Sequence, residues 1–227
     1  MKVRFNSMIK MLGVAAALAF AQGAAAQSAG QLTAKFGVNQ ITPKVESGDI
    51  SAPALPGTKA DVGRDMQPVL IFAYGLTDNI SVEAALGTPY KHKLYGAGAI
   101  EGTGLLGTAE ALPAIAFLQY RFFQPTATFR PFVGIGATYA YFMKERGSAR
   151  MTAITNPGSG VPTTFSIDSK FTYTAQVGVA MNLSEKWFAD VTVNKTRLRT
   201  DVNFSTGQTQ AMKLDPVSVV LAVGYKF

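Results

Sequence analysis

Large apolar residues alternate with small or polar residues along eight segments of the chain. In the last of them, 216–227, every odd position is large and apolar, and the even positions are mostly small. A period of two residues indicates a strand with one face against an apolar medium. The other seven segments are 32–39, 70–74, 80–87, 112–122, 133–141, 171–182 and 187–194. The pattern predicts an all-β fold, an eight-stranded antiparallel β-barrel.

The links between these strands alternate in length, starting with a long one. The short polar links are 77–79, 124–128 and 184–186. The long links cover about 42–65, 91–107 and 146–167, and the last link, near 205–210, is shorter. Transmembrane barrels of bacterial outer membranes have short periplasmic turns and longer extracellular loops. An even number of strands then leaves both ends of the barrel on the periplasmic side.

The apolar faces are predicted to point outward, into lipid. Aromatic residues share these faces and gather near strand ends, as in the girdles at membrane interfaces. They include Tyr74, Tyr120, Phe122, Trp187, Tyr225 and Phe227 near the short turns and Tyr139 and Tyr141 toward the other rim. A soluble lipocalin-like barrel, the alternative with the same strand count, would turn its apolar faces inward. Charged residues are 15% of the chain, below the ~25% of soluble proteins.

The first 26 residues have the three parts of a secretory signal peptide. Lys2, Arg4 and Lys10 precede a short apolar stretch, 11–20, and small residues follow at 24–26. The stretch is shorter than the ~20 residues of a membrane-spanning helix. We therefore expect cleavage after residue 26 and a mature barrel over 27–227, exported through the periplasm to the outer membrane.

Composition excludes several other classes. Loss of the three signal cations lowers the formal net charge of +7 to +4, and no basic groove with interleaved aromatics predicts nucleic-acid binding. The chain has no cysteine, which excludes disulfides and thiolate metal sites.

Charged residues also fall on the inward faces of the predicted strands. They are Lys35, Glu83, Arg121, Asp190 and Lys226. The interior of an eight-stranded barrel is just wide enough for side chains to fill, and buried charges there must be paired. We expect an ion-paired plug that closes the barrel to water and ions and forces an apolar ligand out through the wall; a direct role in binding ligand is the alternative.

No residue pattern predicts catalysis, a metal site or a cofactor. His92, the one histidine, lies between Lys91 and Lys93 with no serine or acidic cluster nearby, and we expect it to be a solvated loop residue. Gly134 and Gly136 lack the third glycine and the following helix of a dinucleotide site. The sequence therefore favours a protein that is not an enzyme; a lipid-modifying barrel enzyme would have His92 as its sole candidate base.

Several segments, taken in order, resemble the OmpW family of outer-membrane proteins, including its AlkL-like hydrocarbon-uptake members. The resemblance covers nearly all of the mature chain. Its segments are Ala34–Gly37, Tyr74–Glu83, Thr88–His92, Leu112–Pro113 with Leu118–Phe122, Arg130–Gly136 and Val223–Phe227. One departure is Ala114, which stands where the family often has a second proline after Pro113.

The resemblance implies a narrow hydrophobic passage from which small apolar molecules leave sideways, through the barrel wall, into the membrane. Proline lacks the N–H that a neighbouring strand would bind, so Pro113 is a candidate for a gap in the wall. A bulge or a strand edge at Pro113 is an equal alternative, and the same two readings apply to Pro89. Ile115 and Phe117 are candidates for lining the passage, and Phe132 is a weaker one.

The function that these features predict is passive uptake of small hydrophobic molecules across the outer membrane. The expected partners are outer-membrane lipids and the solutes themselves, and a monomer is favoured. The alternative is a structural or receptor-type barrel whose extracellular loops bind partners.

Overall fold

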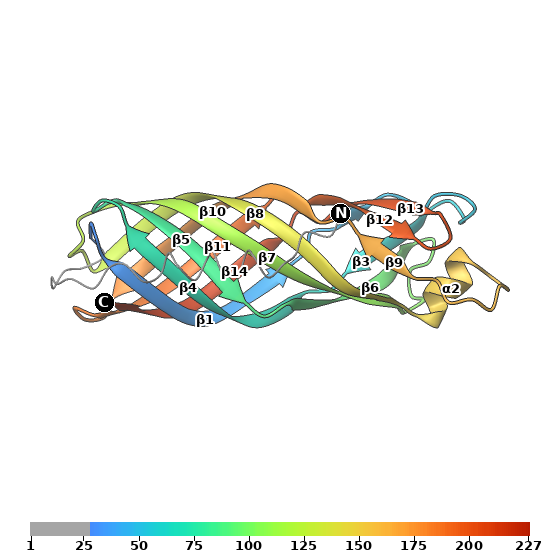
Figure 1. Cartoon of the computed structure of the whole chain (residues 1–227), viewed down its shortest axis with the longest axis horizontal. Coiled ribbons are helices and arrows are strands. Elements are labelled where there is room, and N and C mark those ends of the chain that lie inside the picture. The colour runs from blue at the N-terminus through green and yellow to red at the C-terminus, as the bar shows by residue number, and fades with distance from the viewer. Residues whose placement is uncertain (1–27) are drawn as a thin grey trace, which may run out of the picture.

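The computed structural model describes residues 28–227, which form a closed antiparallel β-barrel (Figure 1). Eight strands make the wall in this part of the chain, because β5 and β6 together act as one strand interrupted at Thr88 and Pro89. The wall elements are β1 (Leu32–Thr42), β4 (Asp65–Gly75), β5 (Ile80–Gly87), β6 (Tyr90–Gly98), β7 (Leu105–Arg121), β8 (Phe129–Gly147), β10 (Lys170–Asn182), β11 (Trp187–Thr196) and β14 (Val217–Lys226). The predicted fold class is confirmed. The predicted signal peptide, 1–26, lies outside the described residues and stays a prediction.

The alternation in the sequence sorts residues between the two sides of the wall. On β14, Leu221 and Val223 are about half exposed, whereas Val220 and Ala222 are buried inside the barrel. The aromatic residues predicted to form the girdle at the short turns also point outward, and Trp187 packs edge-on against Tyr225. The apolar band is therefore on the outer surface, and the lipocalin-like alternative is wrong.

One end of the barrel is closed by tight turns. In the first of them the Leu76 N–H donates to the Ile80 carbonyl. The Asn79 amide then donates to the carbonyls of Arg121 and Phe123, which ties this turn to the next one. The Phe227 N–H donates to the Leu32 carbonyl, so both ends of the described chain lie at this end, as predicted (Figure 1).

The opposite end carries the long links expected over 42–65, 91–107 and 146–167, and these links are folded. The elements there are β2 (Glu46–Ser47), β3 (Thr58–Val62), α2 (Ala149–Thr155), β9 (Phe165–Ile167), β12 (Arg199–Phe204) and β13 (Thr209–Lys213). Strands β2, β13, β12 and β9 form a second sheet, while β3 pairs with β6. Ser148 caps α2 by accepting from the Met151 N–H. Among the described residues no helix is long and apolar enough to cross a membrane.

A separate apolar cluster explains why these links fold. It brings together Ile50, Leu106, Met151 and Phe204, all less than a tenth exposed and each from a different link or strand extension. Burial of apolar surface offsets the entropy lost when the links become ordered. The apolar residues of each link are few and come together only in the folded chain, so the pattern along any one link was too weak to predict its strands.

Candidate functional site

Three oppositely charged side chains meet inside the barrel. The Lys35 ammonium lies 2.7 Å from a Glu83 carboxylate oxygen and 3.2 Å from Asp190. All three side chains are at most 2% exposed. Thr192 donates to Asp190, and the Gln176 amide donates to Glu83. Each carboxylate therefore has both a cation and a neutral donor, which is the arrangement that buried charges require.

Arg121 completes the same layer, so that two cations face two carboxylates. Its guanidinium donates to Ser81 and Gln119 and lies 4.8 Å from the centre of the Phe132 ring. The structure thus brings together Lys35, Glu83, Arg121 and Asp190, and places Phe132 with them rather than along a passage. We call these five residues the charged layer.

Lys226, the fifth inward charge, lies elsewhere. Its ammonium donates to the Asn182 side-chain oxygen at 2.8 Å and lies over the ring of Phe188. Arg130, which the sequence analysis missed, is fully buried and donates to the carbonyls of Asp78 and Phe123 in two neighbouring turns. These two cations bind the closed end together and are not part of the charged layer.

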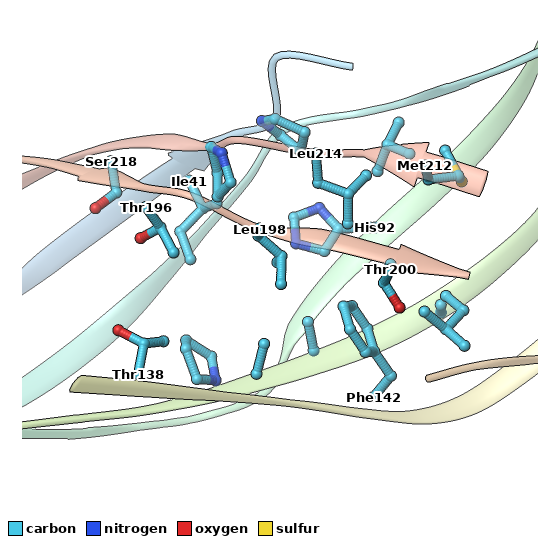
Figure 2. A pocket seen from close by; sticks show the side chains of 18 of the residues that line it. Ile41, His92, Thr138, Phe142, Thr196, Leu198, Thr200, Met212, Leu214 and Ser218 are labelled. Carbon is cyan, nitrogen blue, oxygen red and sulfur yellow. The ribbon is translucent and has the colours of Figure 1, made fainter. Parts of the chain in front are cut away.

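A cavity of about 90 Å³ lies beyond the charged layer, toward the folded outer end. Figure 2 shows its labelled side chains, which come from opposite walls of the barrel. Most lining groups are apolar, among them Ile41, Leu94, Ala140, Phe142, Leu198 and Leu214. The polar lining groups on the side of the charged layer are Asn39, Thr138, Thr196 and Ser218. An apolar cavity with few polar groups is typical of a site for a small hydrophobic molecule.

The four candidate passage residues divide into two groups. Pro113 and Ile115 line the cavity. Phe117 is buried but does not line it; the Phe117 ring packs where a Cβ on Gly136 would lie. Pro89 is in the link between β5 and β6 and is also absent from the lining.

The wall is interrupted beside the cavity. Pairing between β5 and β7 ends at Ala85 and Ile115, and pairing between β6 and β7 begins at Tyr90 and Ala111. Residues 86–89 therefore have no partner on β7, and 112–114 have none on β5 or β6. The register also shifts by one residue across this stretch, as in a bulge. A gap in the strand pairing and a bulge, the two alternatives that the sequence left open at Pro113, therefore occur together.

His92 is a correction to the sequence analysis. It lies on β6, is 8% exposed and points into the cavity, where Nδ1 is 2.8 Å from the Gly63 carbonyl (Figure 2). Burial lowers the pKa of its imidazole, and the Gly63 carbonyl and the Asp65 charge oppose this only in part. The flanking lysines suggested solvent, but Tyr90, His92 and Leu94 alternate with Lys91 and Lys93, and that alternation was the available signal.

The residues that the structure describes include no group of three histidine, aspartate or glutamate side chains able to hold a metal ion. An outward apolar band and a filled, ion-paired interior define the class of this protein as a small transmembrane barrel of a bacterial outer membrane. The OmpW family model matches residues 28–227, and the chain belongs to the OmpW family.

Known relatives agree with this assignment. The chain is 29% identical to outer membrane protein W of Vibrio cholerae, over 95% of this chain and 97% of that protein. It is 26% identical to the dibenzothiophene metabolism operon protein PahQ of Pseudomonas aeruginosa, over 76% and 77% of the two chains. The crystal structure of the outer membrane protein OprG from Pseudomonas aeruginosa superposes with a TM-score of 0.79 at 25% identity, covering 89% of this chain and 98% of that one.

Proposed function

We propose that this protein takes up small hydrophobic molecules passively across the outer membrane and releases them sideways through the wall near Pro113. One observation carries the proposal: an apolar cavity lies between a charged layer and an unpaired stretch of wall. The name of the relative PahQ, which refers to dibenzothiophene metabolism, supports an apolar solute. No catalytic residue or cofactor is needed for this function.

The charged layer favours a sideways path over a path along the barrel axis. A solute moving toward the short turns would have to separate Lys35 from Glu83 and Asp190. Breaking such a buried pair leaves uncompensated charge, which is strongly unfavourable. An apolar solute offers no hydrogen bond in return, so the axial path is closed to it.

The unpaired stretch offers the alternative path. Residues 86–89 and 112–114 do not pair with each other, although 86–87 pair with β4 and 112–114 with β8, so a solute passing between the two segments breaks no ladder hydrogen bond there. Leu86 and Ala114 are exposed on the outer face of this stretch. A solute that leaves the cavity past Pro113 and Ile115 would therefore meet the lipid directly.

A reversible cross-link across the unpaired stretch tests the exit. The chain has no cysteine, so the pair Leu86→Cys and Ala114→Cys can be oxidised and reduced in one purified sample. The matched control is Ala84→Cys with Ala116→Cys, a pair already in register on the same two strands. Uptake of an apolar fluorescent probe is measured in proteoliposomes, and gel mobility confirms each cross-link.

We expect oxidation to lower probe uptake at least about tenfold in the first pair, with recovery after reduction, and to leave the control pair unchanged. Full uptake through the oxidised first pair would refute the side exit while leaving hydrophobic uptake in place. Folded wild-type protein that adds nothing to the uptake of empty liposomes would refute uptake itself.

The folded outer end favours a second candidate function, that of a receptor-type barrel. This end has its own apolar cluster and a separate four-stranded sheet, so it presents a fixed surface. Replacing the β12–β13 turn, 205–207, would abolish partner binding and spare probe uptake if this candidate is right. Unchanged partner binding after that replacement would count against it.

A further inference from the structure

A basic patch lies on the outer wall of the folded end, over β6, β8 and the residue before β4. It consists of Arg64, Lys91, Lys93, Lys144 and Arg146, all of them exposed. Within the described part of the chain, Lys144 alone among the five has an ion pair, with Glu110 at 3.0 Å. The other four cations therefore have no close carboxylate partner in this part of the chain.

Strand pairing holds these cations close together. Lys93 pairs with Thr108 on β7, and Thr108 pairs with Arg146 on β8. Neighbouring strands are about 4.8 Å apart, so the Cα atoms of Lys93 and Arg146 are separated by only about 10 Å. The Gly63 N–H donates to the Lys93 carbonyl, which places Arg64 next to the same strand.

The nearby carboxylates make hydrogen bonds to neutral donors or bind Lys144, and among the described residues none forms a close ion pair with the other four cations. Asp65 accepts from the Lys91 backbone N–H and from the Gln67 amide. Glu145 accepts from the Ile167 backbone N–H, and Glu110 binds Lys144. Asp61 on β3 and Glu101 in the connection between β6 and β7 are further exposed acids. Four cations thus have no carboxylate partner there.

Some cations elsewhere on the folded end do have a close carboxylate partner. On the second sheet, Lys213 pairs with Glu46 at 3.0 Å, and Lys170 pairs with Asp168 at 3.2 Å. Surface pairs of this kind balance the local charge and leave little attraction for an outside anion. On the β6–β8 wall, four cations without such a pair lie on or beside neighbouring strands, and this cluster can attract an anion.

The height of the patch in the membrane indicates which anion it meets. The outward residues just below it, Met66 and Leu86, are apolar and half exposed, and Lys91 and Lys93 follow above. This change marks the upper edge of the apolar band, where the headgroups of the outer leaflet lie. Phosphate groups are the anions at that level, and exposed lysine and arginine near an anionic membrane surface attract them.

We infer that the basic patch binds the phosphate groups of a lipopolysaccharide molecule in the outer leaflet. The bound glycolipid then stands directly above the unpaired stretch at Pro113. This binding needs neither the cavity nor transport, so it is independent of the proposed function.

The test measures binding of lipid A to the purified full-length protein in detergent, with intact and dephosphorylated lipid A and with inorganic phosphate as probes. The patch variant is Lys91→Gln, Lys93→Gln and Arg146→Gln. The control variant, Lys195→Gln, Arg199→Gln and Lys213→Gln, removes the same charge from exposed positions elsewhere. Gel mobility before and after heating shows that each variant is folded.

We expect intact lipid A to bind the patch variant at least about tenfold more weakly than wild type, and the control variant to stay within about twofold. Dephosphorylated lipid A should bind wild type and patch variant alike, and inorganic phosphate should compete only weakly. Equal weakening in both variants would show nonspecific attraction and overturn the site. Equal binding of intact and dephosphorylated lipid, or tight binding of inorganic phosphate alone, would overturn a glycolipid ligand.

Discussion

Lys35 holds two buried carboxylates at one point of the barrel interior. Replacing it by methionine leaves Glu83 and Asp190 buried together without a cation. Removing one partner of a buried ion pair costs about 3–5 kcal/mol, so Lys35→Met should lower the free energy of unfolding by roughly that amount. Urea titration of the protein in micelles, followed by tryptophan fluorescence, measures the change.

A control separates lost charge balance from lost packing. Adding Glu83→Gln and Asp190→Asn to Lys35→Met removes the unpaired charges while nearly keeping the volumes of the two acids. Most of the lost stability should return in this triple variant. If the triple variant is as unstable as Lys35→Met alone, packing rather than charge holds the layer together.

His92 gives the protein a predictable dependence on pH. Its pKa in the folded state is lowered by burial, below the value of about 6.5 in an unfolded chain. As the pH falls below about 6.5, His92 becomes protonated in the unfolded state but stays neutral in the folded state, and stability therefore declines. The midpoint of urea unfolding should drop between pH 7.5 and pH 5.5, and His92→Phe should remove part of that drop. An identical drop in the His92→Phe variant would show that His92 does not cause the pH dependence.

Between elements, glycines make room for aromatic rings that fill the barrel. A Cβ on Gly224 of β14 would collide with the Phe188 ring of β11, and a Cβ on Gly178 of β10 would collide with the ring of Phe132. Overpacking of a filled core typically costs about 1–3 kcal/mol, so Gly224→Ala should destabilise the protein by about that amount in the urea titration.

The matched control is Gly48→Ala, because a Cβ there would approach no closer than 3.4 Å to its nearest neighbour. It should change stability little. A second variant, Gly224→Ala with Phe188→Leu, should regain part of the loss because the smaller side chain relieves the collision. If no stability is regained, the cost of Gly224→Ala arises from the backbone of β14 and not from the collision with the Phe188 ring.

At the scale of the elements, the sequence predicted some features well and others poorly. The strands that face lipid along most of their length, such as β14 and β11, follow from alternation alone. The folded end includes strands β6, β9, β12 and β13. Each of them contributes only a few residues to the shared apolar cluster. Their apolar residues are spread over several links, and no single link carries enough of them to predict a strand.

The whole molecule should not form an open, water-filled pore. Paired charges, the Phe132 and Phe188 rings and hydrogen-bonded amides occupy the interior between the cavity and the short turns. Purified protein in a planar bilayer should therefore give no step currents at salt concentrations at which an open porin, used as the control, conducts. Regular steps whose size follows the salt concentration would contradict a closed interior.

The sequence by itself determined what depends on local periodicity and composition. It predicted the eight wall strands except for the outer part of the third, β6, and it predicted the outward apolar face, the tight turns at one end and the inward side of Lys35, Glu83, Arg121 and Asp190. These features follow because a strand repeats every two residues and because lipid and lumen select opposite residue types.

Only the tertiary structure decided which distant residues meet. Lys35 and Asp190 are 155 positions apart and come into contact because closure of the barrel fixes the register of every strand. The same registers leave the stretch at Pro113 unpaired, turn His92 into the cavity and place Lys93 near Arg146. Strand pairing and side-chain packing are properties of the closed sheet, and no segment carries them alone.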